Sequence, residues 1–148
     1  MKFIMFRVKD GINFKQSKQS VWGVNGILLT RIKKLIKGDI LCFITSKEYG
    51  GKIVGFATFV GYHDKRTEPL VSINTYTNKE LGWSETDEWP IQIQYEQLYL
   101  TEDLNLKAII KNINAMIHYD TARLKNNIPD LEFHYRNIMF YMKPKVFV

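Results

Sequence analysis

The chain has almost no cysteine and no long hydrophobic run. Its single thiol, Cys42, excludes a disulfide within these 148 residues. Because Cys42 lies in the apolar run ILCFIT, we expect it to be an inert core residue. No run has the roughly 20 apolar residues that cross a bilayer. The first residues, MKFIMFRVKD, lack the apolar stretch and cleavage site of a signal peptide. These absences predict a cytoplasmic protein with no membrane partner.

The common catalytic motifs are also missing. The sequence contains no glycine-rich phosphate loop, no GxSxG and no HExxH. Its three histidines are scattered at His63, His118 and His134. His118 could pair with Asp120, or the two could hold a metal together with His134. Metal sites need three or four convergent ligands, so we favour ordinary polar residues here.

The acidic residues Glu85, Asp87 and Glu88 could act in acid–base chemistry, but they are also typical of a solvated loop face. We find no set of nucleophile, base and orienting residue. The sequence therefore predicts a binding module rather than an enzyme, with no metal and no cofactor.

Positive charge is concentrated in the first half of the chain. The net charge is +6, yet residues 1–67 carry 13 basic and 4 acidic side chains, while residues 68–102 carry 1 basic and 7 acidic ones. A basic half favours an anionic partner, of which nucleic acid is the commonest, although many small basic proteins bind no polyanion. The length and the 45% hydrophobic content predict one domain over residues 1–148.

Strand signals recur along the first hundred residues. Five runs are rich in β-branched and aromatic residues, a composition typical of strands. Gly50-Gly51 between two of these runs predicts a hairpin, and Gly55 and Gly61 predict bends or bulges. The five runs are residues 2–9, 21–24, 40–45, 52–63 and 90–100.

Helical signals are shorter. Asn13 is a candidate N-cap for a helix over residues 14–20, and residues 30–39 predict a short helix or turn that Gly38 ends. Five to six mostly antiparallel strands with short helices between them predict an α+β fold, a small curled β-barrel with helices packed outside. The remaining segments are expected to form a loop over 64–82, helices over 106–118 and 120–126, and a strand over 137–143.

Three tryptophans stand among small and polar residues. Trp22 lies in SVWGVN, and Trp83 and Trp89 frame the segment GWSETDEW. One interpretation is that each ring folds back and closes the core. The other is that the rings line a ligand pocket, because base–aromatic stacking contributes about 1–3 kcal/mol per base. A flipped-out base could then lie between two rings, with polar groups reading its edge.

The polar groups nearest to Trp22 in the sequence are those of Asn13, Ser20 and Asn25, together with the backbone around Gly23. An asparagine amide both donates and accepts hydrogen bonds, as a base edge requires. A methyl group on the base would add apolar area that an aromatic wall favours.

The order of these features resembles the EVE domain, a member of the PUA-like superfamily that is similar to the YTH domain. The resemblance covers nearly the whole chain. It rests on VWGV at residues 21–24, on the Lys37-Gly38-Asp39 turn before an apolar strand, and on the Gly55-Phe56 strand. It is strongest over residues 1–62 and 83–100 and weak beyond about residue 119.

The resemblance implies a PUA-like barrel with a pocket for a modified base. Trp22 matches the tryptophan that forms the floor or wall of that pocket, and Trp83 and Trp89 are candidates for its other aromatic residues. Asn13 falls near a base-reading asparagine of YTH proteins, although its spacing to Trp22 differs. An aromatic residue often precedes the proline of this strand in EVE proteins, so Trp89 could equally be structural.

We therefore expect a module that binds RNA or DNA carrying a methylated or flipped-out base. Two alternatives remain open: an enzyme that acts on a small nucleotide in the same pocket, which would need a lysine or glutamate inside it, and a protein–protein interaction module. The residues expected to meet phosphates are Lys15, Lys18, Arg31, Lys33 and Lys34.

Overall fold

The computed structural model describes residues 2–67, 75–86, 88–101, 124–126, 135–137, 139–140 and 143–147. None of the helices that these residues form is long and apolar enough to span a membrane. The strands are β1 (Lys2–Arg7), β2 (Val21–Val24), β3 (Ile40–Ile44), β4 (Ile53–Asp64), β5 (Ile91–Leu100) and β6 (Leu124–Asn126). The α-helices are α1 (Ile12–Gln16), α2 (Leu29–Ile32) and α3 (Asn78–Leu81), and the 3-10 helices are η1 (Gly26–Leu28) and η2 (Lys47–Tyr49).

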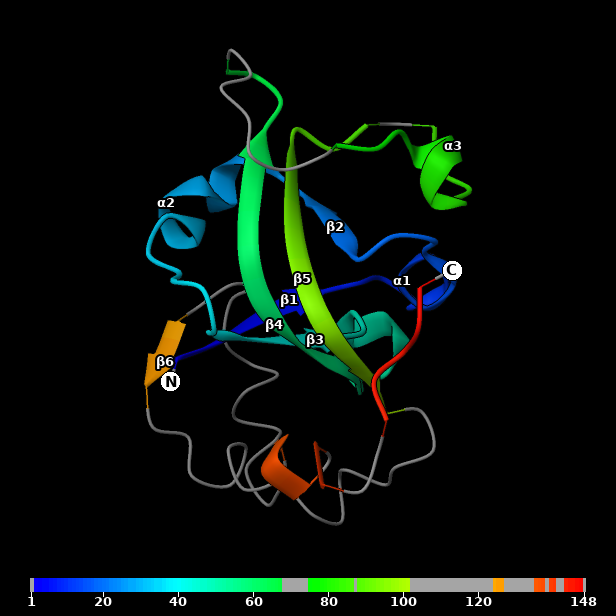
Figure 1. The fold of residues 1–148 in the computed structure, drawn as a ribbon. Helices are drawn as coiled ribbons and strands as arrows, with labels where there is room; N and C mark the ends of the chain where they lie inside the picture. The colour runs from blue at the N-terminus through cyan, green and yellow to red at the C-terminus, as the bar shows by residue number, and fades with distance from the viewer. Residues whose placement is uncertain are drawn as a thin grey trace.

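The strands form one curled sheet in the order β2-β5-β4-β3-β1-β6. Strands β1 and β3 pair in parallel, and every other neighbouring pair is antiparallel. The long strands β4 and β5 bend together across the molecule, and the short helices lie around the sheet (Figure 1). The predicted fold class, a curled and mostly antiparallel sheet of five to six strands with short helices outside, is confirmed as a half-barrel.

The predicted hairpin and both of the predicted bends or bulges are present. Strands β3 and β4 are joined through η2 and the turn at Gly50 and Gly51, both of which have positive φ angles. The β4–β5 register shifts between Phe59 and Gly61, as expected for a bulge at Gly61. The β3–β4 register also shifts beside Gly55, which pairs with Phe43 while Ile44 pairs with Ile53. Gly55 serves close packing as well, because a Cβ there would lie 3.0–3.1 Å from Phe14 and Leu98.

An aromatic cluster forms the centre of the core. The Phe14 ring lies 4.3 Å from that of Phe43 and 5.9 Å from that of Trp22, measured between ring centroids. Tyr95 adds its ring 5.3 Å from Phe43. Cys42 is fully buried in β3, and burial raises the pKa of its thiol far above the ordinary value. The expected inert core cysteine is thereby confirmed.

Three predicted elements were wrong. Asn13 lies inside α1, whose N-cap position is Gly11, because Gly11 supplies the left-handed turn that starts the helix. Residues 124–126 pair with β1 as a strand rather than forming part of a helix. Residues 135–137 and 139–140 are helical, and three of them, 137, 139 and 140, fall in the strand that we expected over 137–143. The predicted helix over 106–118 lies outside the described residues.

Candidate functional site

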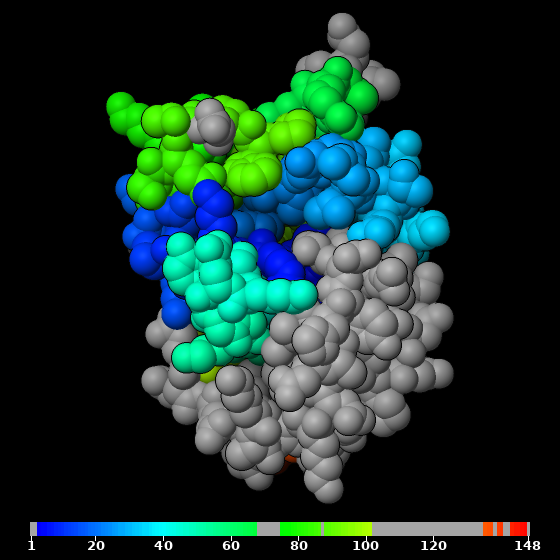
Figure 2. Space-filling model, turned by 180° about the vertical axis from the view of Figure 1, so that it is seen from behind, coloured from blue at the N-terminus to red at the C-terminus, as the bar shows by residue number. Residues whose placement is uncertain are grey.

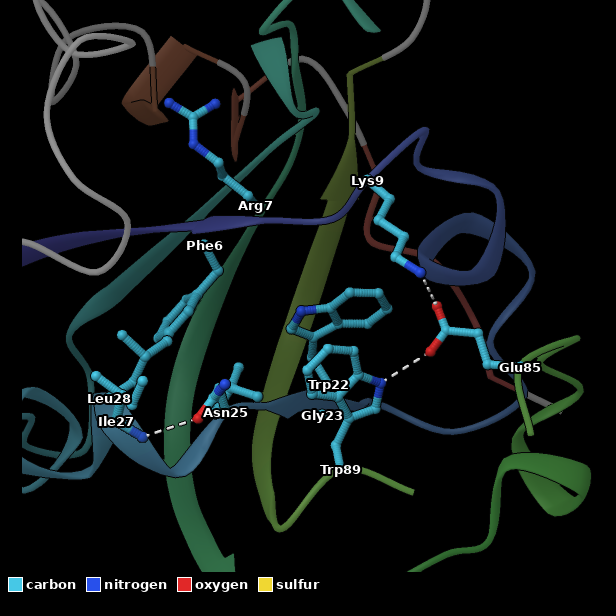
Figure 3. A pocket seen from close by; sticks show the side chains of 11 residues that line it. Phe6, Arg7, Lys9, Trp22, Gly23, Asn25, Ile27, Leu28, Glu85 and Trp89 are labelled. Carbon is cyan, nitrogen blue, oxygen red and sulfur yellow. Dashed lines mark hydrogen bonds and ion pairs between the residues drawn. The ribbon is translucent and has the colours of Figure 1, made fainter. Parts of the chain in front are cut away.

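Trp22 is held at the centre of β2 by the pairing of that strand with β5. It lies opposite Ile93 in the register, with Gly23 opposite Gln92. Only 8% of its surface is exposed, and its ring packs edge-on against Phe14. The nitrogen edge of its indole turns toward the side of the site where Phe6 and Asn25 lie (Figure 3). Trp22 is therefore a core residue of which one edge remains accessible.

The predicted loop over 64–82 contains a short helix, α3, that places Trp83. Thr77 and Glu80 form a capping box at its start. The backbone N–H of Thr77 donates to Glu80, which lowers the pKa of that carboxyl. Gly82 ends the helix in a left-handed conformation, and the Trp83 N–H donates to the Asn78 carbonyl at 2.9 Å. Trp83 is thereby directed into the core.

Trp83 packs against the ring of Trp22. The two ring centroids lie 5.0 Å apart, and Trp83 is 6% exposed. Its Nε1 donor is buried without a partner among the described residues. The placement fits core closure for this ring, which was one of the two interpretations of the sequence.

Trp89 lies directly on the backbone of β2. A Cβ added to Gly23 would meet the Cβ, Cγ and Cδ1 atoms of Trp89 at 2.7–2.8 Å, so only glycine leaves room for this side chain. The indole Nε1 donates to Glu85 Oε2 at 2.9 Å, and Lys9 Nζ donates to Glu85 Oε1 at 3.0 Å. The Glu85 hydrogen bond is the main reason that the pKa of Lys9 is raised. Glu85 is therefore engaged on both oxygens rather than simply solvated.

Trp22 and Trp89 line a hollow of about 370 Å³. Among the described residues, no ring contact joins the two indoles. Seen from behind the molecule, dark-blue residues of the N-terminal segment lie at the bottom of this hollow, between the green and cyan segments (Figure 2). Its apolar lining is Phe6, Trp22, Gly23, Val24, Ile27, Leu28 and Trp89, and its polar lining is Arg7, Lys9, Asn25 and Glu85.

The first hollow is lined mostly by apolar residues, and its charged residues lie on one side of it. The Arg7 side chain points away from the two indoles, and Lys9 and Glu85 lie beside them (Figure 3). A second hollow of about 580 Å³ shares Lys9, Asn25, Glu85 and Trp89 with the first. The hydroxyls of Ser84 and Thr86 also line it. The site thus combines an aromatic, apolar hollow with a more polar neighbour.

The structure brings four of the seven predicted base-binding residues together: Trp22, Gly23, Asn25 and Trp89 line the first hollow. The other three line neither hollow: Trp83, Asn13 and Ser20. Asn13 Oδ1 accepts from the Ser84 N–H at 3.3 Å, so Asn13 stabilises the 83–86 segment instead. Asn25 Oδ1 accepts from the Ile27 N–H as the cap of η1, and its Nδ2 has no hydrogen-bond partner within the described part of the chain.

The five predicted phosphate-binding residues lie outside both hollows: Lys15, Lys18, Arg31, Lys33 and Lys34. Lys9 could not be identified as a site residue from the sequence, because its position depends on where β1 ends in the sheet. His118, Asp120 and His134, for which we favoured ordinary polar roles over a metal site, lie outside the described residues, and so does Asp87. Within the described part of the chain, no group of three or more His, Cys, Asp and Glu residues could hold a metal.

We expect Gly23→Ala to displace Trp89 from β2. Carbon atoms pack best at about 3.5–4.0 Å, so the added Cβ overpacks the seat of Trp89, which is its contact with the β2 backbone at Gly23. The free energy of unfolding, measured by urea denaturation, is expected to fall by about 1–3 kcal/mol. Gly26→Ala is the control, because its Cβ would meet only the guanidinium end of Arg66. Moving that group costs its half-exposed ion pair with Asp64, a contact that is weak at the surface, so a smaller loss is expected. Equal stability losses in the two variants would contradict the proposed seat.

Comparison with protein-family models finds no match, and neither does comparison with curated proteins. Solved structures do match. The YTH domain of the Zygosaccharomyces rouxii MRB1 protein, in complex with N6-methyladenosine RNA, superposes with a TM-score of 0.61 and 10% identity over 97% of this chain and 89% of that one. The chain has a YTH-like fold.

Two further YTH-like matches agree with this fold. The Pho92 YTH domain in complex with m6A has a TM-score of 0.54 and 13% identity, covering 99% of this chain and 89% of that one. An Mmi1 YTH domain in complex with RNA has a TM-score of 0.55 and 12% identity, covering 98% and 84%. At these identities the similarity to the YTH domains concerns the fold.

Proposed function

We propose that this YTH-like protein binds single-stranded nucleic acid and holds one methylated base between Trp22 and Trp89. The observation that carries the proposal is the hollow of about 370 Å³ lined by both indoles. This volume falls within the roughly 300–1,000 Å³ of small-molecule pockets. A base withdrawn from its strand is flat and mostly apolar, and it matches such a lining in shape and chemistry.

The apolar lining also gives a reason to prefer a methylated base. A methyl group buried against Ile27, Leu28 or the indoles contributes about 0.8 kcal/mol. That energy corresponds to an affinity difference of about fourfold. Asn25 Nδ2 adds a donor for an acceptor on the base edge. Methylation therefore strengthens binding while the amide fixes the orientation of the base.

The structural relatives indicate which probe to use first. Two of them were solved with N6-methyladenosine or m6A. We extend that ligand class to this chain as part of the proposal, and membership of the EVE group within the PUA-like proteins is a further part of it. The exposed cations Lys18, Lys33 and Lys34, with Lys15 and Arg31, are proposed to contact the phosphates.

The experiment compares oligonucleotides that differ only in one methyl group. The protein is titrated with fluorescently labelled single strands, as RNA and as DNA, carrying N6-methyladenine, 5-methylcytosine or neither. We expect at least one methylated strand to bind about fourfold more tightly than its unmodified counterpart, with affinity falling as salt rises. Equal affinity for every strand would refute recognition of a methylated base.

One observation supports the alternative of an enzyme that acts on a small nucleotide. Such an enzyme would need a lysine or a glutamate inside the pocket, and Lys9 and Glu85 both line the hollow. Their mutual ion pair and the Glu85–Trp89 hydrogen bond give them a structural role, so binding remains the better-supported function. Incubation with methylated nucleosides followed by mass spectrometry separates the two functions, because only an enzyme releases a product.

A further inference from the structure

Trp89 is partly exposed and lies in a segment without regular secondary structure, and yet it forms a wall of the hollow. It lies between α3 and β5, directly before Pro90. Two contacts hold it: the flat seat on the β2 backbone at Gly23 and the hydrogen bond from its Nε1 to Glu85 Oε2 at 2.9 Å. The seat restricts the start of the side chain, from Cβ to Cδ1, and the hydrogen bond restricts the nitrogen edge.

Glu85 connects this wall to the turn that follows β1. Its second oxygen accepts from Lys9 Nζ at 3.0 Å, across 76 residues of sequence. Lys9 is itself held in a left-handed turn with φ of 53°, where its carbonyl accepts from the Ser46 N–H at 2.9 Å. The Lys9 side chain is 65% exposed and that of Glu85 only 20%. Because exposed ion pairs are weak, the charge-assisted hydrogen bond to the indole is the stronger of the two contacts.

From these contacts we propose that Glu85 is the positioning residue for Trp89. The inference rests on the proposed function, in which Trp89 stacks on the base. A wall that is fixed before the ligand arrives spares the complex the cost of ordering a side chain. Glu85 also lines the hollow, but both of its oxygens are engaged by Trp89 and Lys9, so its contribution to affinity comes through the orientation of the indole.

The test uses two substitutions that remove the same charge. Glu85→Ala removes the acceptor, whereas Glu85→Gln retains an amide oxygen that can accept from Trp89 Nε1. In the free protein, the indole N–H resonance of Trp89, assigned by its absence in Trp89→Phe, is expected to move and to exchange faster with water in Glu85→Ala. In Glu85→Gln it is expected to stay close to its wild-type position. The resonances of Trp22 and Trp83 serve as internal controls.

Binding of the methylated strand is measured on the same variants. We expect Glu85→Ala to bind about 2- to 12-fold more weakly than wild type, the range that corresponds to ordering one side chain, and Glu85→Gln to bind within about twofold of wild type. Glu48→Ala, which removes an exposed acidic residue that lines neither hollow, controls for the change of net charge and is expected to leave the Trp89 resonance unchanged.

The outcomes separate this inference from the proposed function. If Glu85→Ala and Glu85→Gln behave alike in both measurements, charge rather than positioning explains the effect and the inference is wrong. If wild type prefers no methylated strand while the Trp89 resonance still responds to Glu85→Ala alone, the positioning is correct and the proposed function fails. If wild type discriminates and Glu85→Ala leaves both resonance and affinity unchanged, only the positioning fails.

Discussion

Trp89→Ala is expected to weaken binding of the preferred methylated strand by about 5- to 150-fold. This range follows from the roughly 1–3 kcal/mol that one base–aromatic stack contributes. Trp89 is only half-buried and packs against the edge of the core, so the variant is expected to stay folded. Fluorescence anisotropy of a labelled oligonucleotide measures the effect without depending on the tryptophan signal.

Tyr49→Ala is the control for the loss of an aromatic side chain. Tyr49 is 50% exposed and lines neither hollow. It is expected to leave the affinity for methylated and unmodified strands unchanged. If Trp89→Ala bound the methylated strand as tightly as Tyr49→Ala did, Trp89 would have no part in holding the base.

Trp22 and Trp83 are expected to share a structural role but to differ in binding. Both are more than nine-tenths buried and pack on each other, so each alanine variant is expected to lose about 3–5 kcal/mol of unfolding free energy in urea denaturation. Only Trp22 lines the hollow. Loss of the preference for a methylated strand is therefore expected in Trp22→Ala and not in Trp83→Ala.

Phenylalanine variants allow the same comparison if the alanine variants do not fold. Trp22→Phe and Trp83→Phe retain a ring in the core, and the fraction of folded protein is checked by circular dichroism before each titration. Trp83→Phe also removes a buried donor that has no partner among the described residues, and such a donor is itself destabilising. If the Trp83 variants lost methyl preference as fully as the Trp22 variants, the assignment of the wall to Trp22 and Trp89 would be wrong.

Local sequence signals predicted most of the sheet. The runs around β2, β3, β4 and β5 are dense in β-branched and aromatic residues, and each forms a strand close to the expected bounds. Gly50-Gly51 predicted the β3–β4 hairpin because both positions need positive φ angles that glycine adopts freely. These features succeeded because they depend on the conformation of adjacent residues.

Predictions failed where a distant partner decides the conformation. Residues 124–126 form a strand because β1 offers them an edge. Asn13 is a plausible cap in sequence, yet the left-handed Gly11 starts α1 two residues earlier, and the Asn13 Oδ1 accepts from the Ser84 N–H. The parallel pairing of β1 with β3 likewise required knowledge of the sheet order.

For the site, the sequence by itself determined one strip of the lining, because Trp22 and Gly23 in β2 and Asn25, the cap of η1, are close neighbours in the chain. The tertiary structure alone decided which indole of GWSETDEW forms the second wall. Trp83 and Trp89 lie six residues apart in an irregular segment where no period of strand or helix sets their direction. Their placement depends on α3, on the absence of a side chain at Gly23, and on the Glu85 carboxylate, which accepts from Trp89 and from Lys9, 76 residues before Glu85 in the sequence.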